Sequence, residues 1–274
     1  MKKIIVPIFL LGLMATVVCF SCKKNQNKVA DYSITDSTLA HIKIIDASDS
    51  FRKVTKGMPD SFNVYVNGER VTSSTSAPAV PSMTFGAIFP GLASAGSAYL
   101  TVSPGSASIR LSYDGVVNAD SVTILSLTKT LVPGGYYTFM ITDSLLSTRD
   151  SNRIFVRDYY KTPVPGYVNL RFINAVINDT AGKTVDLWSY ARNAAVLTKI
   201  KPDSVTSFQS LGINSGVSDT FYVRRTGTTL NLAKLLFPPV GQTASQRTYT
   251  LFYYGDGNLT GTAKKARTLG YYNH

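Results

Sequence analysis

Imidazole groups are scarce in this sequence, whose 274 residues contain two histidines, His41 and His274. A charge-relay triad or a histidine-rich metal site needs an imidazole held beside further polar groups. His41 falls in a run that predicts a strand, where we expect its side chain to face outward, and His274 is the last residue. Neither position predicts nucleophilic or metal-assisted hydrolysis.

Carboxylates are the next candidates, because a pair of them can hydrolyse a glycosidic bond. Two close pairs stand among turn-forming residues, where Asp usually accepts hydrogen bonds from nearby backbone N–H groups: Asp46 with Asp49, and Asp114 with Asp120. Gly255–Asn258 contains one Asp of a calcium-loop pattern and lacks the further carboxylates that such a loop needs. The sequence therefore predicts no catalytic residue, no metal site and no cofactor.

The aromatic side chains offer a binding chemistry, because a flat aromatic ring can stack on a sugar ring. Trp188 and Tyr190 are two residues apart in a predicted strand and share one face. Two interpretations of this pair stay open: packing in the core, which is favoured because Trp188 aligns with Tyr65 in the repeat below, and a glycan-binding surface. Neighbouring strand residues point to opposite faces, so each Tyr-Tyr pair should send one ring inward: Tyr159–Tyr160, Tyr253–Tyr254 and Tyr271–Tyr272.

The N-terminus has the pattern of an export signal. Met1–Lys3 supplies positive charge, and the apolar run Ile4–Phe20 is shorter than the roughly 20 residues that a transmembrane helix needs. We therefore expect residues 1–21 to be a signal peptide; the alternative is an uncleaved anchor.

Both thiols of the chain lie in this region, at Cys19 and Cys22. Ser21 places a small residue before Cys22, as in the lipobox of bacterial lipoproteins, whereas bulky Val18 precedes Cys19. We expect lipid on Cys22, cleavage before it, and attachment to a membrane by several acyl chains.

Residues 22–38 are polar and are predicted to form a flexible, lipidated tether. Lysines and amides follow Cys22, where an acidic run often directs lipoproteins to the surface. The expected location is the cell envelope, at the outer membrane, with the periplasmic face favoured and surface exposure as the alternative.

Strand signals dominate from residue 39 onward, with short Val-, Ile-, Tyr- and Phe-rich runs between turn-forming residues. Phe62–Val66 is followed by Asn67-Gly68, which predicts a type I′ hairpin. Only Leu230–Phe237 is a short helix candidate. The fold class expected is all-β.

Three blocks of sequence recur in the same order, which indicates an internal repeat. The segments that align are His41–Ala47 with Asn169–Ala175, Phe62–Tyr65 with Val185–Trp188, and Tyr137–Met140 with Tyr249–Phe252. A proline-containing linker, Lys161–Gly166, lies between the copies. We predict two β-sandwich domains, 39–162 and 163–274.

The positive charge is concentrated in the second copy. Lys23–Pro165 carries 14 basic and 11 acidic residues (+3), whereas Gly166–His274 carries 12 and 5 (+7). An exported protein rarely meets nucleic acid, so anionic headgroups or acidic glycans are the expected partners of this charge. The alternative is a solvated basic surface that keeps the protein soluble.

The repeated blocks resemble the domain-of-unknown-function family 4397 of exported bacterial proteins, in two tandem copies. Arg171–Ala175 and Val185–Trp188 match in the second copy, and Phe62–Gly68 and Pro133–Thr138 in the first. The resemblance covers about Ala40–Asp143 and Gly166–Asp256. It implies immunoglobulin-like β-sandwiches and supplies no catalytic residue. Asn63 and Asp46 depart from the pattern.

These observations lead to one functional hypothesis and two alternatives. We expect a non-enzymatic lipoprotein of the cell envelope that binds a glycan or a protein partner, with Trp188 and Tyr190 as candidate ligand-binding residues. The first alternative is a structural spacer or self-associating surface module. A hydrolase is the last.

Overall fold

The computed structural model describes residues 38–49, 61–72, 82–91, 98–113, 123–142, 153–179, 183–213, 217–238, 246–263 and 265–274. These ranges contain strands and turns and no helix, which confirms the all-β prediction. No helix that could span a membrane is found in these ranges. The predicted signal peptide, Cys22 and tether residues 22–37 lie outside them, as do Asp114 and Asp120.

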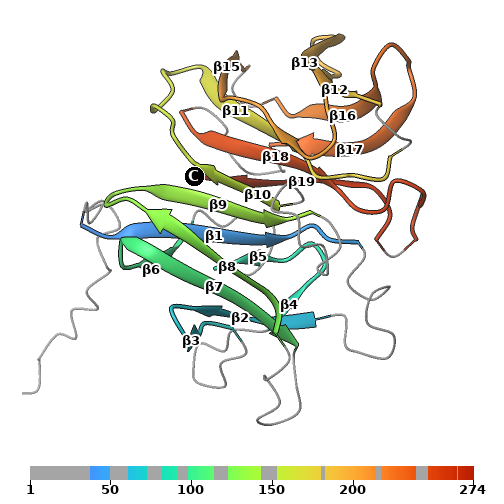
Figure 1. Cartoon of the computed structure of the whole chain (residues 1–274). Helices are drawn as coiled ribbons and strands as arrows, with labels where there is room; N and C mark the ends of the chain where they lie inside the picture. Colours follow the sequence, from blue (N-terminus) through green and yellow to red (C-terminus); the bar gives the residue numbers. More distant parts are fainter. Residues whose placement is uncertain are drawn as a thin grey trace, which may run out of the picture. The chain divides into compact units, whose positions relative to one another are not determined.

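The strands β1 to β10 form two sheets, which we number 1 and 2 (Figure 1). Sheet 1 has the order β10-β9-β1-β5, with β6 also paired to β1: β1 (Ala40–Asp46), β5 (Ile88–Phe89), β6 (Leu100–Val102), β9 (Tyr136–Ile141) and β10 (Arg153–Arg157). Sheet 2 has the order β3-β2-β7-β8, with β4 paired to β2: β2 (Ser61–Val66), β3 (Glu69–Arg70), β4 (Met83–Thr84), β7 (Gly105–Tyr113) and β8 (Thr123–Leu131).

The strands β11 to β19 form two further sheets, 3 and 4. Sheet 3 has the order β14-β11-β18-β19, with β15 paired to β11: β11 (Tyr167–Asn174), β14 (Ser204–Val205), β15 (Gln209–Gly212), β18 (Thr248–Tyr254) and β19 (Thr268–Asn273). Sheet 4 has the order β13-β12-β16-β17: β12 (Val185–Ser189), β13 (Ala194–Ile200), β16 (Asp219–Arg225) and β17 (Asn231–Phe237). The helix candidate Leu230–Phe237 is therefore wrong, because β17 pairs with β16 along this segment.

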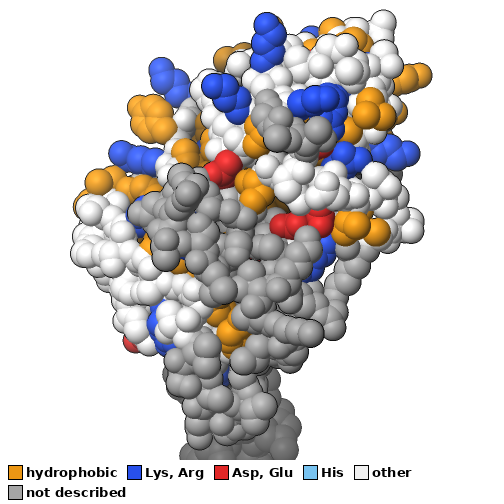
Figure 2. All heavy atoms as spheres, turned by 45° about the vertical axis from the view of Figure 1, so that its right-hand side comes forward, with side chains coloured by type: hydrophobic (Ala, Val, Ile, Leu, Met, Phe, Trp, Pro, Cys, Tyr) orange, Lys and Arg blue, Asp and Glu red, His pale blue; other side chains and the backbone are white. Residues whose placement is uncertain are grey.

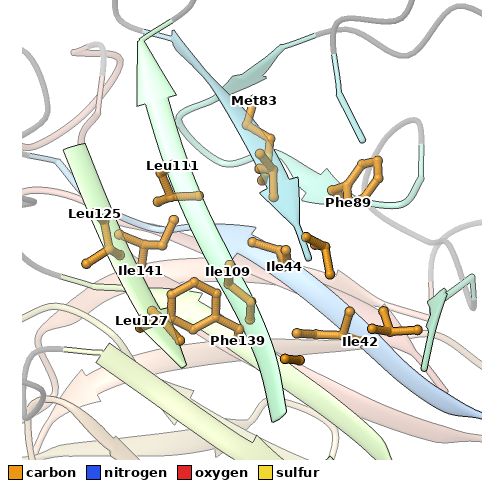
Figure 3. Close-up of a cluster of buried hydrophobic side chains, with 14 of the residues drawn as sticks. Ile42, Ile44, Met83, Phe89, Ile109, Leu111, Leu125, Leu127, Phe139 and Ile141 are labelled. Carbon is orange, nitrogen blue, oxygen red and sulfur yellow. The ribbon is translucent and has the colours of Figure 1, made fainter. Parts of the chain in front are cut away.

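Each pair of sheets encloses one apolar core. Ile42, Ile44 and Phe139 of sheet 1 meet Ile109 and Leu111 of sheet 2, as Figure 3 shows. Sheets 3 and 4 enclose an equivalent core that includes Phe172, Leu187, Val223 and Leu251. The sandwich architecture is confirmed, while the domain boundary at residues 162 and 163 stays a prediction.

The predicted hairpin is visible in the backbone, and the two halves of the chain share one strand pairing. Asn67 and Gly68 have φ of 52° and 86°, the positive values that a type I′ turn requires at both central positions. In both halves the first strand pairs in parallel with a strand from the end of that half: Ile42 lies opposite Tyr137, and Leu170 opposite Tyr249. These partners are equivalent in the repeat alignment, so both halves use one pairing scheme.

Sheets 1 and 3 are buried on both faces. Their second faces share an apolar cluster, here called the inner interface: Ile45, Ala47, Ile88, Met140, Ile154, Ile173, Ala175, Phe252 and Tyr272. Strands in parallel pairs are usually covered on both faces, and β1 and β9 with β11 and β18 follow that rule. One ring of each Tyr-Tyr pair on β18 and β19 therefore faces a sandwich core and the other faces the inner interface.

A polar network is buried beside this cluster. Arg171 Nη2 donates to Asp158 Oδ1 at 2.6 Å, and the two side chains are 2 and 0 % exposed. Asp158 Oδ2 accepts from Thr138 Oγ1 at 2.8 Å and from Tyr99 Oη at 2.9 Å. Arg171 Nη2 also donates to Tyr272 Oη at 3.0 Å, which bonds to Thr138. Every oxygen of this carboxylate thus has a donor, as a buried charge requires.

His274 belongs to the same network as a neutral imidazole. Burial lowers the pKa of His274 well below its usual value, and Arg171 and Lys43 lower it further. Tyr99 Oη gives its proton to Asp158, so its 2.6 Å contact with His274 Nδ1 makes that nitrogen the donor. His274 Nε2 then accepts from Thr250 Oγ1 at 2.8 Å. This arrangement assigns His274 a structural role.

Lys43 on β1 is the second buried cation. Its Nζ lies 4.5 Å from the ring centre of Tyr99 and 4.7 Å from that of Tyr272, and it donates to the carbonyl oxygen of Asn273 at 3.3 Å. Burial lowers the pKa of Lys43 to about 7, although the charge of Asp158 opposes this shift.

Folding stability should therefore rise with pH between about 7 and 10. In that window unfolded Lys43, whose usual pKa is 10.5, holds a proton that the folded residue has released, so stability gains up to about 1.4 kcal/mol per pH unit. Above about pH 10 the raised pKa values of Tyr99 and Tyr272 reverse the trend. Urea unfolding at pH 6.5 to 9.5 measures the rise. Lys43→Met should flatten it; an equal rise in the variant would contradict the assignment.

Gly270 of β19 allows Phe252 to pack in the inner interface. A Cβ at residue 270 would lie 2.7 Å from Phe252 Cζ, whereas at Gly212 the nearest side-chain atom would be 3.5 Å away. Gly270→Ala should lower the free energy of unfolding by about 1–3 kcal/mol through overpacking. Gly212→Ala is the matched control and should leave it nearly unchanged. Urea unfolding of both variants checks this; equal stability would contradict it.

Candidate functional site

The outer face of sheet 4 carries aromatic and basic side chains in rows across β12, β16 and β17. One row holds Trp188, Tyr222 and Lys234, because Trp188 pairs with Tyr222 and Tyr222 with Lys234. The next row holds Asp186, Arg224 and Asn231, and the row on the other side holds Tyr190, Thr220 and Leu236. We call these nine residues the aromatic face. Figure 2 shows basic side chains gathered on the part of the molecule that Figure 1 gives to β11–β19.

Arg224 lies over the indole ring of Trp188. Its Cζ atom is 4.2 Å from the ring centre of Trp188 and 5.6 Å from that of Tyr222. Its Nε donates to Asn231 Oδ1 at 2.8 Å, which fixes the orientation of the guanidinium plane. A cation over an aromatic face at this distance is attractive by about 0.5–1 kcal/mol at an exposed site.

Tyr190 is 70 % exposed, yet its backbone is held firmly. It begins the turn 190–193 between β12 and β13, and its N–H donates to Thr220 O at 3.0 Å. Asp219 fastens the same turn, since Oδ1 accepts from Ala191 N at 2.8 Å and Oδ2 accepts from Ser189 Oγ. The ring is thus presented to solvent on a fixed backbone, 6.5 Å from the ring of Tyr222.

The prediction that Trp188 and Tyr190 share a face is confirmed, and the favoured core position of Trp188 is wrong. Leu187 and Ser189 point inward and are fully buried, so Trp188 lies on the outer face and is partly exposed. Its counterpart Tyr65 is also partly exposed, with Arg110 Cζ 3.7 Å from its ring centre. The alignment identified equivalent positions but not the side of the sheet that they face.

The remaining candidates have structural roles. His41 lies on the face of β1 opposite to Ile42 and Ile44, where it is partly exposed and stacks on Tyr136 at 4.4 Å between ring centres. Asp46 Oδ1 accepts from Ser48 N at 3.1 Å, as expected of a turn residue. Asp256 Oδ1 accepts from Asn178 Nδ2 and Asn258 N, which occupies the carboxylate of the calcium-like loop. The described ranges contain no group of three potential metal ligands.

Of the Tyr-Tyr pairs, only the first has an exposed ring. Tyr159 is 76 % exposed, whereas Tyr160 stacks edge-on against Phe208 and His274 nearby. Burial, reinforced by the charge of Asp158, raises the pKa of Tyr160 to about 12.

Sequence reasoning missed Tyr222, Arg224 and Lys234. The alternation of Tyr222 and Arg224 in β16 was readable, because Phe221 and Val223 are apolar and the residues that alternate with them must face the other side. That β16 pairs with β12 was not readable, because the pairing joins segments more than 30 residues apart.

Comparison with known protein families identifies the family of this chain. The profile of the domain of unknown function DUF4397 matches residues 50–187, half of the chain. The chain belongs to this family. The DUF4397 match is single and runs from the first half into β12, so the two tandem copies stay a prediction.

Two further comparisons complete the picture of this DUF4397 protein. No curated protein matches the sequence. Among solved structures, a candidate adhesin from Bacteroides ovatus is similar over 84% of this chain and 96% of that chain, at 10% identity. The TM-score of 0.21 is too low to carry an argument about fold or function.

Asp219 should be required for a rigid turn at Tyr190. Asp219→Ala removes the acceptor of Ser189 Oγ and Ala191 N, at a cost of about 1–3 kcal/mol. The loosened turn should also be cleaved faster by trypsin after Arg192, followed by mass spectrometry of the released ends. Thr198→Ala, at an exposed position of β13, is the control. Unchanged cleavage in Asp219→Ala would show that the turn is held by other contacts.

Proposed function

We propose that this protein is a non-enzymatic binding module of the cell envelope that holds a glycan on the aromatic face of sheet 4. The observation that carries the proposal is the grouping of Tyr190, Trp188 and Tyr222 on one exposed sheet surface, with Arg224 and Lys234 beside them. The rings of Tyr190 and Tyr222 are tilted by 60° to each other and Arg224 covers the indole, so the ring that is offered to a sugar is that of Tyr190, with Trp188 and Tyr222 beside it.

Two physical features support ligand binding over simple surface packing. The side chain of Tyr190 is 70 % exposed, so most of its apolar surface does not contribute to the stability of this chain through burial. Its turn is fixed by Asp219 and Ser189, so binding a ligand does not require the loop to become ordered. Preorganisation of this kind raises affinity because less conformational entropy is lost on binding.

The proposed location is the periplasmic face of the outer membrane, with lipid on Cys22 and residues 22–38 as the tether. The charged signal and the small residue before Cys22 support export and lipidation, and the lysines and amides after Cys22, in place of an acidic run, support the periplasmic face. A partner fixed in the envelope would then be reached by a protein that cannot diffuse away from the membrane.

Glycan binding should depend on the rings of Trp188 in β12 and of Tyr190 in the turn that follows it. On a glycan array, Trp188→Ala and Tyr190→Ala should each lose most of the signal of the full-length protein. Tyr159→Ala removes a similarly exposed tyrosine outside sheet 4 and should bind as the unmodified protein does. Binding that survives in both Trp188→Ala and Tyr190→Ala would place the ligand elsewhere and contradict the proposal.

Self-association is the second candidate, and the long edge of β8 favours it. Within the described ranges β8 pairs with β7 alone, which leaves the other edge of a nine-residue strand available for strand addition. Concentration-dependent assembly by light scattering, together with no signal on the array, would favour this function over glycan binding.

A further inference from the structure

We infer that the ligand of the aromatic face is an acidic polysaccharide, whose carboxylate or sulfate groups bind Arg224 and Lys234 while a sugar ring stacks on Tyr190. This inference rests on the proposed glycan-binding function and names its substrate class. It is carried by the position of one guanidinium and by how the neighbouring acidic groups are used.

Arg224 is oriented to receive an anion. One face of its guanidinium covers the indole of Trp188, and Nε is used by Asn231. The two terminal Nη groups have no hydrogen-bond partner in the described part of the chain, and they form the fork that matches a carboxylate or sulfate. A neutral sugar would leave these donors without an ionic partner.

Lys234 adds a second cation at a distance that one sugar chain can span. It is exposed, and it lies opposite Tyr222 in the row next to that of Arg224. The two charges therefore stand on adjacent strands and adjacent rows of the same face. Successive acidic residues of a polysaccharide can engage them in turn.

The two carboxylates of this region are committed to the protein itself. Asp186 Oδ1 accepts from Lys199 N at 2.8 Å and from Thr226 Oγ1 at 2.7 Å. Asp219 accepts from Ser189 and Ala191. Both carboxylates therefore accept hydrogen bonds that hold the backbone of their own strands and turns. The net charge of Gly166–His274 is +7. Asp186 and Asp219 keep their charges, so the positive balance that favours an anion is that of the second half as a whole.

The first half contains a matched arrangement without the stacking ring. Arg110 covers Tyr65 as Arg224 covers Trp188. At the position equivalent to Tyr190 stands Asn67, whose Oδ1 accepts from Ser108 N at 3.0 Å. The faces thus share a cation–aromatic pair, but only sheet 4 adds an exposed ring. Arg110→Gln is therefore the control for Arg224→Gln.

The test uses acidic glycans and their neutral counterparts on the full-length protein in detergent. Every acidic glycan that binds on an array is compared with its carboxyl-reduced or desulfated form. Trp188 is the single tryptophan, so its fluorescence reports binding at this face. The acidic form should bind at least about tenfold more tightly, because hydrogen bonds to charged groups are worth that much. The preference should shrink between 50 and 500 mM NaCl as charges are screened.

The variants separate the possible results. Arg224→Gln should weaken binding of the acidic form by about tenfold or more and leave the neutral form unchanged, and Lys234→Gln should act in the same direction. Arg110→Gln should have no effect. If Arg224→Gln changes the fluorescence spectrum of the free protein, the variant has altered the surroundings of Trp188. The effect of Lys234→Gln, at an exposed position, then tests the inference by itself.

Three results would overturn the inference. Equal binding of acidic and neutral forms leaves glycan binding intact and removes the acidic specificity. Equal weakening by Arg110→Gln and Arg224→Gln shows a general charge effect. Binding to phosphatidylglycerol vesicles without binding to any glycan, or binding to neither, rejects both the inference and the proposed function.

Discussion

The buried ion pair of Arg171 with Asp158 is the contact on which the arrangement of the sheets depends. The pair lies at the inner interface, where sheets 1 and 3 exclude water from both partners. A buried pair is costly unless each charge is fully hydrogen-bonded, and here Thr138, Tyr99 and Tyr272 provide the remaining bonds. These partners come from both halves of the chain. The network therefore specifies how the halves fit together, and Lys43 is held in the same region with its pKa lowered to about 7.

Because sheets 1 and 3 are covered on both faces, sheets 2 and 4 are the ones whose outer faces are left uncovered by the residues that the structure describes. Sheet 2 shows a regular alternation, with Ala107 and Ile109 inside and Ser106 and Ser108 outside. Both outer faces carry a cation–aromatic pair, and sheet 4 adds to it Tyr222, Lys234 and the exposed ring of Tyr190. The burial of the inner sheets thus restricts where the proposed binding surface can lie, and the chemistry of the side chains is the reason for proposing sheet 4.

The sequence predicted the strands, the type I′ hairpin and the repeat, because those depend on local patterns. It could not show that Tyr271 and Tyr272 are both buried, since alternation assigns opposite faces but does not say whether both are covered. The burial of Lys43 could not be predicted for the same reason. The pattern of its strand indicates one exposed face, yet the Lys43 side chain is 0 % exposed. For Trp188 the prediction was wrong because its alignment with Tyr65 was interpreted as a shared core position, whereas both residues lie on outer faces and are partly exposed. In each case the missing information was which sheet lies against which.

The difference between the two outer faces follows from the length of one turn. A two-residue hairpin of type I′ needs positive φ at both central positions, which favours Asn-Gly and gives no place to an aromatic residue. The side chain of Asn67 accepts a hydrogen bond from Ser108 N instead. The equivalent turn in the second half has four residues, and the positive φ of 47° falls on Asn193. Tyr190 is therefore free to keep ordinary backbone geometry and project its ring beside Trp188. Two extra residues in a turn thus convert a cation–aromatic pair that stabilises a sheet into part of a surface suited to a sugar chain.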